Sequence, residues 1–341
     1  MDVDRAPTRS GVEVRRAAAA FARPIKSHGV AQLLTSFGPF IAACVSMYLV
    51  YPISPLFAVS LALLAGVLLV RVFIIQHDCG HGSFFASARA NTVVGRACSL
   101  FTMTPFVSWA RQHGQHHGNW SNLDPRMGSD LYSACLTVRE YLALSRWRRL
   151  LYRLPRHPLV ANVLLPPVVF LLLYRIPFDT PRRWVRERRS IHLTNAALLA
   201  LFGSLALLLG WQKVLVLHLS VMAVASIVGV WLFSLQHRFD TARWTRREEW
   251  DASIASMEAS SWFGLPKVLH WLTGNIGFHH IHHLNPRVPS YRLGAAHDAV
   301  QRLWPVEPLS LLGGLRAPWL TLWDEACGRL VSFRDAARTA A

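Results

Sequence analysis

Long apolar runs alternate with basic, histidine-containing segments along this chain. Four runs are long enough to cross about 30 Å of hydrocarbon, which takes roughly 20 apolar residues in a helix. They form two pairs, Ala31–Tyr51 with Ile53–Ile75 and Leu193–Trp211 with Val214–Leu235. The connections at Pro52 and at Gln212-Lys213 leave room only for tight turns. The pattern therefore predicts an all-α integral membrane protein with four transmembrane helices in two hairpins, plus cytoplasmic and interfacial helices.

Two further apolar stretches contain prolines, which remove a helical N–H group and clash with the preceding turn. Val93–Trp109 is interrupted by Pro105, and Leu159–Ile176 by Pro166-Pro167. Arginines flank the second stretch on both sides, at 146–153 and 182–189. Since cytoplasmic loops collect Lys and Arg, we expect a re-entrant or interfacial element there. The alternative, six crossings, would separate one histidine group from the others.

Four crossings place both termini, the loop Gln76–His192 and the segment after Gln236 on one side of the membrane. The basic residues indicate that this side is cytoplasmic. The N-terminal segment lacks the apolar core of a cleavable signal peptide. We therefore expect a cytoplasmic N-terminal arm (1–30), a membrane domain (31–300) and a cytoplasmic C-terminal tail (301–341).

Composition supports a membrane protein, with 52% hydrophobic and 16% charged residues among 341. A formal net charge of +17 could indicate a nucleic-acid partner, but no nucleic-acid-binding motif accompanies it. We expect membrane lipids, and no nucleic acid, to meet the arginine clusters. The five cysteines are scattered without a C-x-x-C pair, which argues against a disulfide scaffold or a thiolate metal site.

Histidines carry the most specific signal in the sequence. Sixteen are present, and eight fall into three groups. The groups are His77-x-x-x-His81, His113-x-x-His116-His117 and His279-x-x-His282-His283. Residues at i, i+3 and i+4 lie on one side of a helix, so each group is expected to aim its imidazoles at one point.

Imidazole is suited to iron, copper, zinc and nickel. Eight imidazoles exceed the needs of one tetrahedral zinc ion, and the H-E-x-x-H motif of zinc proteases is absent. The pattern predicts two metal ions. His237, directly after the last apolar run, is predicted to be a ninth ligand. His280 would point away from its neighbours, and His218 lies inside a predicted span.

The three boxes resemble those of the membrane fatty-acid desaturase superfamily. HDCGHGSFF at 77–85, QHRFD-x-x-x-W at 236–244 and TGNIGFHHIHHLNPRVPSYRL at 273–293 are most similar to the acyl-lipid, Δ12-type branch. The resemblance runs from about residue 30 to 300. It implies two iron ions bound by one set of ligands: His77, His81, His113, His116, His117, His279, His282 and His283, with His237 completing it.

The resemblance also implies a reaction. Such enzymes use dioxygen as a co-substrate and two external electrons to place a cis double bond in a fatty acyl lipid or acyl thioester. No fused electron-donor domain is recognisable, so an external carrier of the ferredoxin or cytochrome b5 type is expected. A strong methylene C–H bond offers no acidic proton, so a redox metal is needed.

Several finer assignments remain open at this level. A hydroxylase or ketolase acting on a lipid, carotenoid or alkane would have the same ligand set, and a histidine-rich metal transporter is a further alternative. Carboxylates near the boxes could orient the imidazoles; the candidates are Asp78, Asp124, Asp130 and Asp240. An apolar tunnel should hold the acyl chain; the candidate wall residues are Phe84, Phe85, Trp109, Trp120 and Phe278.

Overall fold

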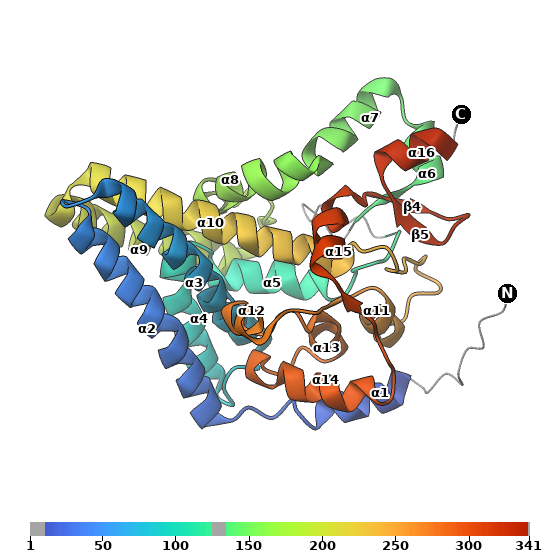
Figure 1. Cartoon of the computed structure of the whole chain (residues 1–341), viewed down its shortest axis with the longest axis horizontal. Helices are drawn as coiled ribbons and strands as arrows, with labels where there is room; N and C mark the ends of the chain where they lie inside the picture. The colour runs from blue at the N-terminus through green and yellow to red at the C-terminus, as the bar shows by residue number, and fades with distance from the viewer. Residues whose placement is uncertain (1–10, 125–133, 340–341) are drawn as a thin grey trace.

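The computed structural model describes residues 11–124 and 134–339, in which four long helices form the body of the molecule (Figure 1). They are α2 (Lys26–Val50), α3 (Pro55–His81), α9 (Val185–Leu209) and α10 (Trp211–His237). All four are long and apolar enough to cross a membrane. The predicted all-α membrane fold with two helical hairpins is confirmed.

The two hairpin turns are built differently. Ser54 caps α3 by accepting a hydrogen bond from the Phe57 N–H, and Pro55 occupies the first helical position, where its missing N–H costs nothing. Between α9 and α10 the chain reverses at Gly210, whose φ of 92° favours glycine. The predicted turn at Gln212-Lys213 is therefore wrong by about two residues, because glycine allows the earlier reversal.

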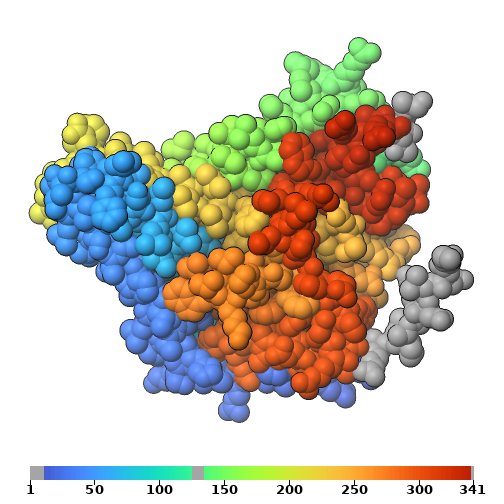
Figure 2. Space-filling view, viewed as in Figure 1, coloured from blue at the N-terminus to red at the C-terminus, as the bar shows by residue number. Residues whose placement is uncertain are grey.

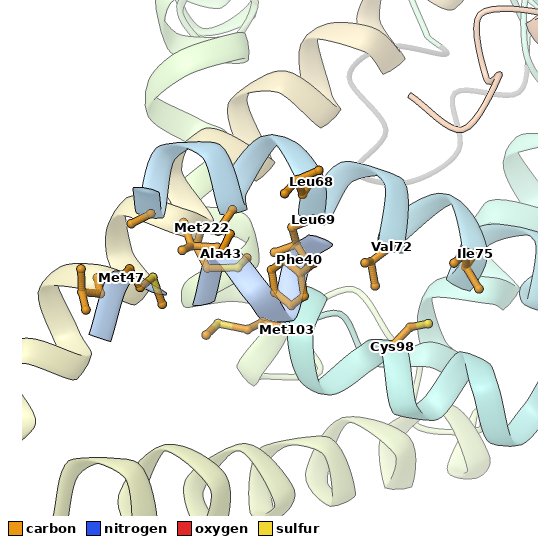
Figure 3. Packing of buried hydrophobic residues seen from close by; sticks show 14 of the residues in the cluster. Phe40, Ala43, Met47, Leu68, Leu69, Val72, Ile75, Cys98, Met103 and Met222 are labelled. Atoms are coloured by element: carbon orange, nitrogen blue, oxygen red, sulfur yellow. The ribbon is translucent and has the colours of Figure 1, made fainter. Parts of the chain in front are cut away.

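Close packing holds α3 and α10 side by side. A Cβ atom added to Gly66 on α3 would lie 2.7 Å from the carbonyl oxygen of Val221 on α10. From this contact, 15 residues lead to His81 and 16 to His237, which is about 22 and 24 Å of helix. Side chains from α2, α3 and α10 interlock around the same region (Figure 3). The histidine-bearing ends of α3 and α10 are thereby held together.

Two shorter helices follow the first hairpin, α4 (Ala88–Thr102) and α5 (Phe106–His116). They meet at Met103, which has a φ of 51°, and at Pro105, so the predicted break is confirmed. The Arg111 guanidinium on α5 lies 3.0 Å from the Glu187 carboxylate and 4.1 Å from the centre of the Trp184 ring. The second histidine box therefore lies against the beginning of α9.

A bent segment connects this region to α9. It contains α7 (Arg146–Arg153), η1 (Leu154–Arg156), the π-helix η2 (Val160–Leu164), α8 (Leu165–Leu171) and η3 (Leu173–Arg175). Its two halves are bent by 46°. Helix α5 ends, and α9 begins, at the same end of the bundle. The chain between them therefore makes no net crossing from one end of the bundle to the other. This agrees with a re-entrant or interfacial element and excludes the six-crossing alternative.

Short elements close the histidine-bearing end of the bundle, and those near the C-terminus cover one face of the molecule there (Figure 2). The α-helices are α1 (Gly11–Ala19), α6 (Val138–Ala143), α11 (Ala252–Glu258), α12 (Lys267–Leu272), α13 (His279–Leu284), α14 (Leu293–Gln301), α15 (Leu311–Arg316) and α16 (Phe333–Thr339). The 3₁₀ turns are η4 (Ser290–Arg292) and η5 (Ala317–Trp319). Val14 and Ala18 of α1 are buried against α13 and α14.

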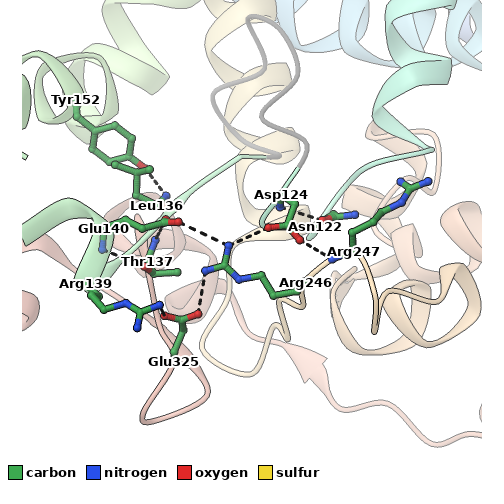
Figure 4. Close-up of polar contacts among 10 residues, drawn as sticks. All are labelled: Asn122, Asp124, Leu136, Thr137, Arg139, Glu140, Tyr152, Arg246, Arg247 and Glu325. Carbon is green, nitrogen blue, oxygen red and sulfur yellow. Dashed lines mark hydrogen bonds and ion pairs between the residues drawn. The ribbon is translucent and has the colours of Figure 1, made fainter. Parts of the chain in front are cut away.

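Within the described residues, five short strands, which the apolar pattern does not predict, tie distant segments together. One sheet has the order β1 (Leu136–Thr137), β4 (Leu322–Asp324), β5 (Arg329–Val331), and a second pairs β2 (Trp262–Phe263) with β3 (Pro308–Leu309). Beside the first sheet, the Arg246 guanidinium lies 2.9 Å from the Asp124 carboxylate and 3.0 Å from that of Glu325 (Figure 4). This network fastens the loop after the second histidine box to the chain that follows α10.

Candidate metal centre

Four helices bring their histidines to one place. His77 and His81 lie in the last turns of α3, which ends when Gly82 adopts the left-handed conformation. The second box occupies the end of α5, with His117 as its C-cap residue. His237 is the last residue of α10. The third box forms α13, and all of its residues are buried.

All nine predicted ligands fall into two adjacent groups. The first group consists of His77, His81, His113, His117 and His282. The second group consists of His116, His237, His279 and His283. Within each group, the facing nitrogen atoms all lie within 4.8 Å of one another. The stacked rings of His117 and His283, 4.1 Å apart, join the two groups.

The groups do not coincide with the boxes, so the expectation that each box aims at one point is wrong for the second and third. In the second box, His113 and His117 belong to the first group and His116 belongs to the second. In the third box, His282 belongs to the first group, whereas His279 and His283 belong to the second. Successive helical residues point about 100° apart, so an i, i+4 pair and the intervening i+3 residue can serve neighbouring points.

The distances within the groups fit metal coordination. Nε2 of His237 lies 3.0 Å from that of His116 and 3.1 Å from that of His279. In the first group, Nε2 of His117 lies 2.9 Å from that of His282 and 3.2 Å from that of His113. Imidazole nitrogens about 2.1 Å from one ion, at right angles to each other, would lie about 3.0 Å apart.

The protonation states and the unpaired ring nitrogens of these histidines also fit metal coordination. Burial lowers the pKa of His113, His117 and His282 well below the ordinary 6.5, and neighbouring imidazoles lower it further. These rings are therefore neutral and carry a lone pair. Nε2 of His81 and both ring nitrogens of His283 are buried and have no hydrogen-bond partner among the residues that the structure describes. Buried polar atoms without partners are costly, and a metal ion would remove that cost.

Among the candidate carboxylates that the structure describes, one contacts a predicted ligand. The Asp78 carboxylate lies 3.1 Å from His77 Nδ1 and accepts a 2.6 Å hydrogen bond from the Ser290 N–H. This contact leaves Nε2 of His77 to face the group. Asp124 instead binds Arg246, and Asp240 is exposed, without a contact to a histidine among the described residues. Asp130 lies outside the described residues.

The remaining histidines stay outside both groups. Nε2 of His280 lies 3.1 Å from Nδ1 of His297, and burial lowers the pKa of His280 to about 3. His280 thus anchors α13 to α14. His270 stacks on Phe278, with ring centres 4.4 Å apart. His218 packs against Phe202 within the bundle.

A cavity of about 590 Å³ opens beside the two groups. Histidines of both groups line one end of it, namely His77, His113, His116 and His279. Mostly apolar side chains, chiefly from α3, α8 and α10, line the rest, which reaches as far as Met222 on α10. From Met222 to Gln236 the helix rises about 21 Å. Such a space accommodates an apolar chain whose one end lies beside the histidines.

Most of the candidate wall residues lie elsewhere. Only Trp109 lines this cavity, where its ring stacks on His113 at 4.7 Å. Trp120 packs on His283 at 4.2 Å, and Phe84 contacts Tyr291. The sequence did not predict that α8 lines the cavity with residues such as Pro166 and Phe170. The proline pair marked an interruption there, without showing which side of the bent helix faces the bundle.

Fold and site together define a membrane protein with two all-histidine groups, one fully and one largely buried, beside an apolar cavity. Among the described residues, neither group includes a carboxylate or a thiolate. A family model for Fatty acid desaturase matches residues 53–311, and the chain belongs to that family. It is therefore an oxidoreductase of the desaturase type.

Individual relatives agree with this assignment. The chain is 40% identical over 322 residues to a fatty acid desaturase of Bacillus subtilis, an alignment that covers 94% of this chain and 90% of the relative. It is 26% identical over 278 residues to an sn-1 oleoyl-lipid 12-desaturase of Picosynechococcus, covering 77% and 75%. An acyl-lipid omega-3 desaturase (cytochrome b5) of Arabidopsis thaliana is 29% identical over 257 residues, covering 70% and 62%.

Proposed function

We propose that this protein introduces a cis double bond into a fatty acyl chain, using dioxygen, two iron ions and external electrons. The supporting observation is the shared boundary between the two histidine groups and the apolar cavity. The donor set suits iron, since imidazole binds it without a buried negative charge. His77, His81, His113, His117 and His282 would hold one ion, and His116, His237, His279 and His283 the other.

The bound irons would supply the oxidising power that no side chain of the protein possesses. The chain's own residues do the rest. The apolar walls of the cavity hold the acyl chain away from water, and Trp109, whose ring stacks on His113, lines the cavity beside that histidine. Two hydrogens leave adjacent methylenes and, with two electrons and two protons from outside, reduce dioxygen to two water molecules.

The electrons come, in this proposal, from a separate carrier of the ferredoxin or cytochrome b5 type. Among the relatives, the name of a Synechocystis omega-3 desaturase includes ferredoxin, and that of the Arabidopsis enzyme includes cytochrome b5. The substrate is a fatty acyl lipid or an acyl thioester. Membrane lipids surround the bundle, whose outer apolar side chains, such as Leu207 and Leu208, are exposed.

We further propose that the active site and both ends of the chain face the cytoplasm. Arginines gather at the histidine-bearing end, whereas the opposite turns carry Lys213 alone as a charged residue. Labelling of the exposed Cys327 by a membrane-impermeant maleimide tests this. Labelling should require opened membranes, and labelling from outside intact cells would refute the orientation.

Product analysis with a His116→Ala variant tests the activity. The full chain would be expressed in a host that lacks polyunsaturated lipids, and its acyl chains analysed by mass spectrometry. We expect a product two hydrogens lighter than its precursor, and its loss in the variant, because His116 links the cavity to the second group. His192→Ala, which changes a histidine outside both groups, is the control and should retain activity.

The outcomes separate the alternatives. A product heavier by one oxygen would identify a hydroxylase or ketolase instead. Full activity of His116→Ala would contradict the ligand assignment. Purified protein with about two irons per chain would support the enzyme, whereas zinc alone, without oxygen-dependent activity, would favour a transporter.

A further inference from the structure

A second cavity of about 590 Å³ lies between α4, the start of α5 and α9. It is formed by other residues than the first cavity and contains none of the nine histidines. On α9 its lining runs from Arg186 to Ala197, a rise of about 16 Å. The cavity therefore extends along the helix from its basic first turns into its apolar part.

Three guanidinium groups surround the outer end of this cavity. Arg186 and Arg189 come from successive turns of α9, and Arg96 comes from α4. In the part of the chain that the structure describes, none of the three forms an ion pair or a hydrogen bond. The nearest carboxylate along the helix, that of Glu187, is buried and paired with Arg111 at 3.0 Å. The positive charge at this end is thus uncompensated.

The inner end of the cavity is apolar. Its lining includes Leu100 on α4 and Leu193, Thr194 and Ala197 on α9, of which Thr194 alone is polar. Leu193 is 53% exposed, so this end is open toward the lipid-facing side of the bundle. A ligand that fits both ends combines a negatively charged group with a hydrocarbon chain, in the orientation that a phospholipid takes in a bilayer.

We propose that this cavity binds one anionic phospholipid, whose phosphate group lies among Arg96, Arg186 and Arg189 and whose acyl chain lies along Leu100, Leu193 and Ala197. Basic pockets between membrane helices are known to suit anionic head groups. An acidic protein would find the three charges, but it has no group to fill the apolar end. The lipid would hold α4 against α9, beside the helix that carries His113 and His116, at a site distinct from the acyl-chain cavity.

Native mass spectrometry of the full chain, purified in detergent, tests the proposal. The probes are phosphatidylglycerol and phosphatidylcholine with identical acyl chains. Wild-type protein should retain one phosphatidylglycerol at least tenfold more tightly than phosphatidylcholine. Each arginine near the bilayer surface contributes about fivefold, so the triple variant Arg96→Ala/Arg186→Ala/Arg189→Ala should lose about a hundredfold.

Two further variants sharpen the test. Arg182→Ala/Arg183→Ala removes charge from the same segment, but these residues are exposed and do not line the cavity, so phosphatidylglycerol binding should change less than threefold or so. Ala197→Trp fills the apolar end and leaves the three charges in place. It should weaken phosphatidylglycerol binding as well, since the acyl chain loses its space.

Three results would overturn the proposal. Equal binding of the two lipids would show that charge plays no part. An equal loss in the Arg182/Arg183 control would show general surface attraction in place of a site. Unchanged lipid binding in the triple variant, together with slower reduction by an electron carrier, would show that these arginines dock a protein. Circular dichroism of each variant verifies that the helices are retained.

Discussion

Asp78 is the residue whose replacement tests the site geometry most directly. Its carboxylate is 2% exposed and serves two partners, His77 Nδ1 at 3.1 Å and the Ser290 N–H at 2.6 Å. Asparagine has the same shape, but one of its two terminal atoms is a donor. If the amide oxygen accepts from Ser290, the NH₂ group faces His77 Nδ1, and the ring proton must move to Nε2.

The size of the effect follows from this exchange. A proton on Nε2 removes the lone pair that faces the first histidine group, so Asp78→Asn should weaken one of the five proposed ligands. If the amide turns round instead, its NH₂ group opposes the Ser290 N–H, and a buried donor loses its partner. Loss of such an orienting group typically lowers metal affinity by 10–100-fold, or about 1.4–2.8 kcal/mol.

The assay is iron retention by the purified full chain against a graded series of chelator. Asp78→Asn should release iron at chelator concentrations about 10–100-fold lower than the wild type. Asp124→Asn is the matched control, because this carboxylate also follows a histidine box but binds Arg246 and the Arg247 N–H. If both variants release iron alike, or neither differs from the wild type, the assigned role of Asp78 is incorrect.

Two other substitutions test the cavity and the closing network. Gly229 lines the acyl-chain cavity and faces open space, so Gly229→Leu should lower desaturation of long acyl chains about tenfold relative to shorter ones, measured by lipid analysis. Gly203→Leu, at an equally open position outside the cavity, should have no such effect, and equal losses would refute the placement. Arg246→Gln removes a partly exposed hub with three carboxylate partners and should lower the free energy of unfolding by about 1–2 kcal/mol; an unchanged melting temperature would contradict this.

The lining of the acyl-chain cavity and the partners of Arg246 could not be predicted from the sequence. The proline pair indicated that Leu159–Ile176 is interrupted, yet only packing against α10 revealed that α8 forms a wall of the cavity. Asp124 follows a histidine box closely in sequence, but its carboxylate turns to Arg246, 122 residues away. Nearness along the chain says little about the partner of a flexible polar side chain.

Local periodicity was sufficient for the helices and for the choice of histidines. Apolar runs of about 20 residues can satisfy their backbone groups in a membrane only as helices, so both hairpins followed from composition and length alone. The spacing of the boxes, and the position of His237 after the last run, identified the same nine residues that the structure brings together. These features depend on neighbours within one or two turns.

Only the tertiary structure decided how those histidines are divided. The crossing of α3, α5, α10 and α13 sends His116 and His117, adjacent in sequence, to different groups. It also joins Asp78 to Ser290 across 212 residues, and leaves His280 to anchor α14. A helix fixes the angles between its own side chains, whereas the points at which they meet other helices depend on packing between segments that are distant in the sequence.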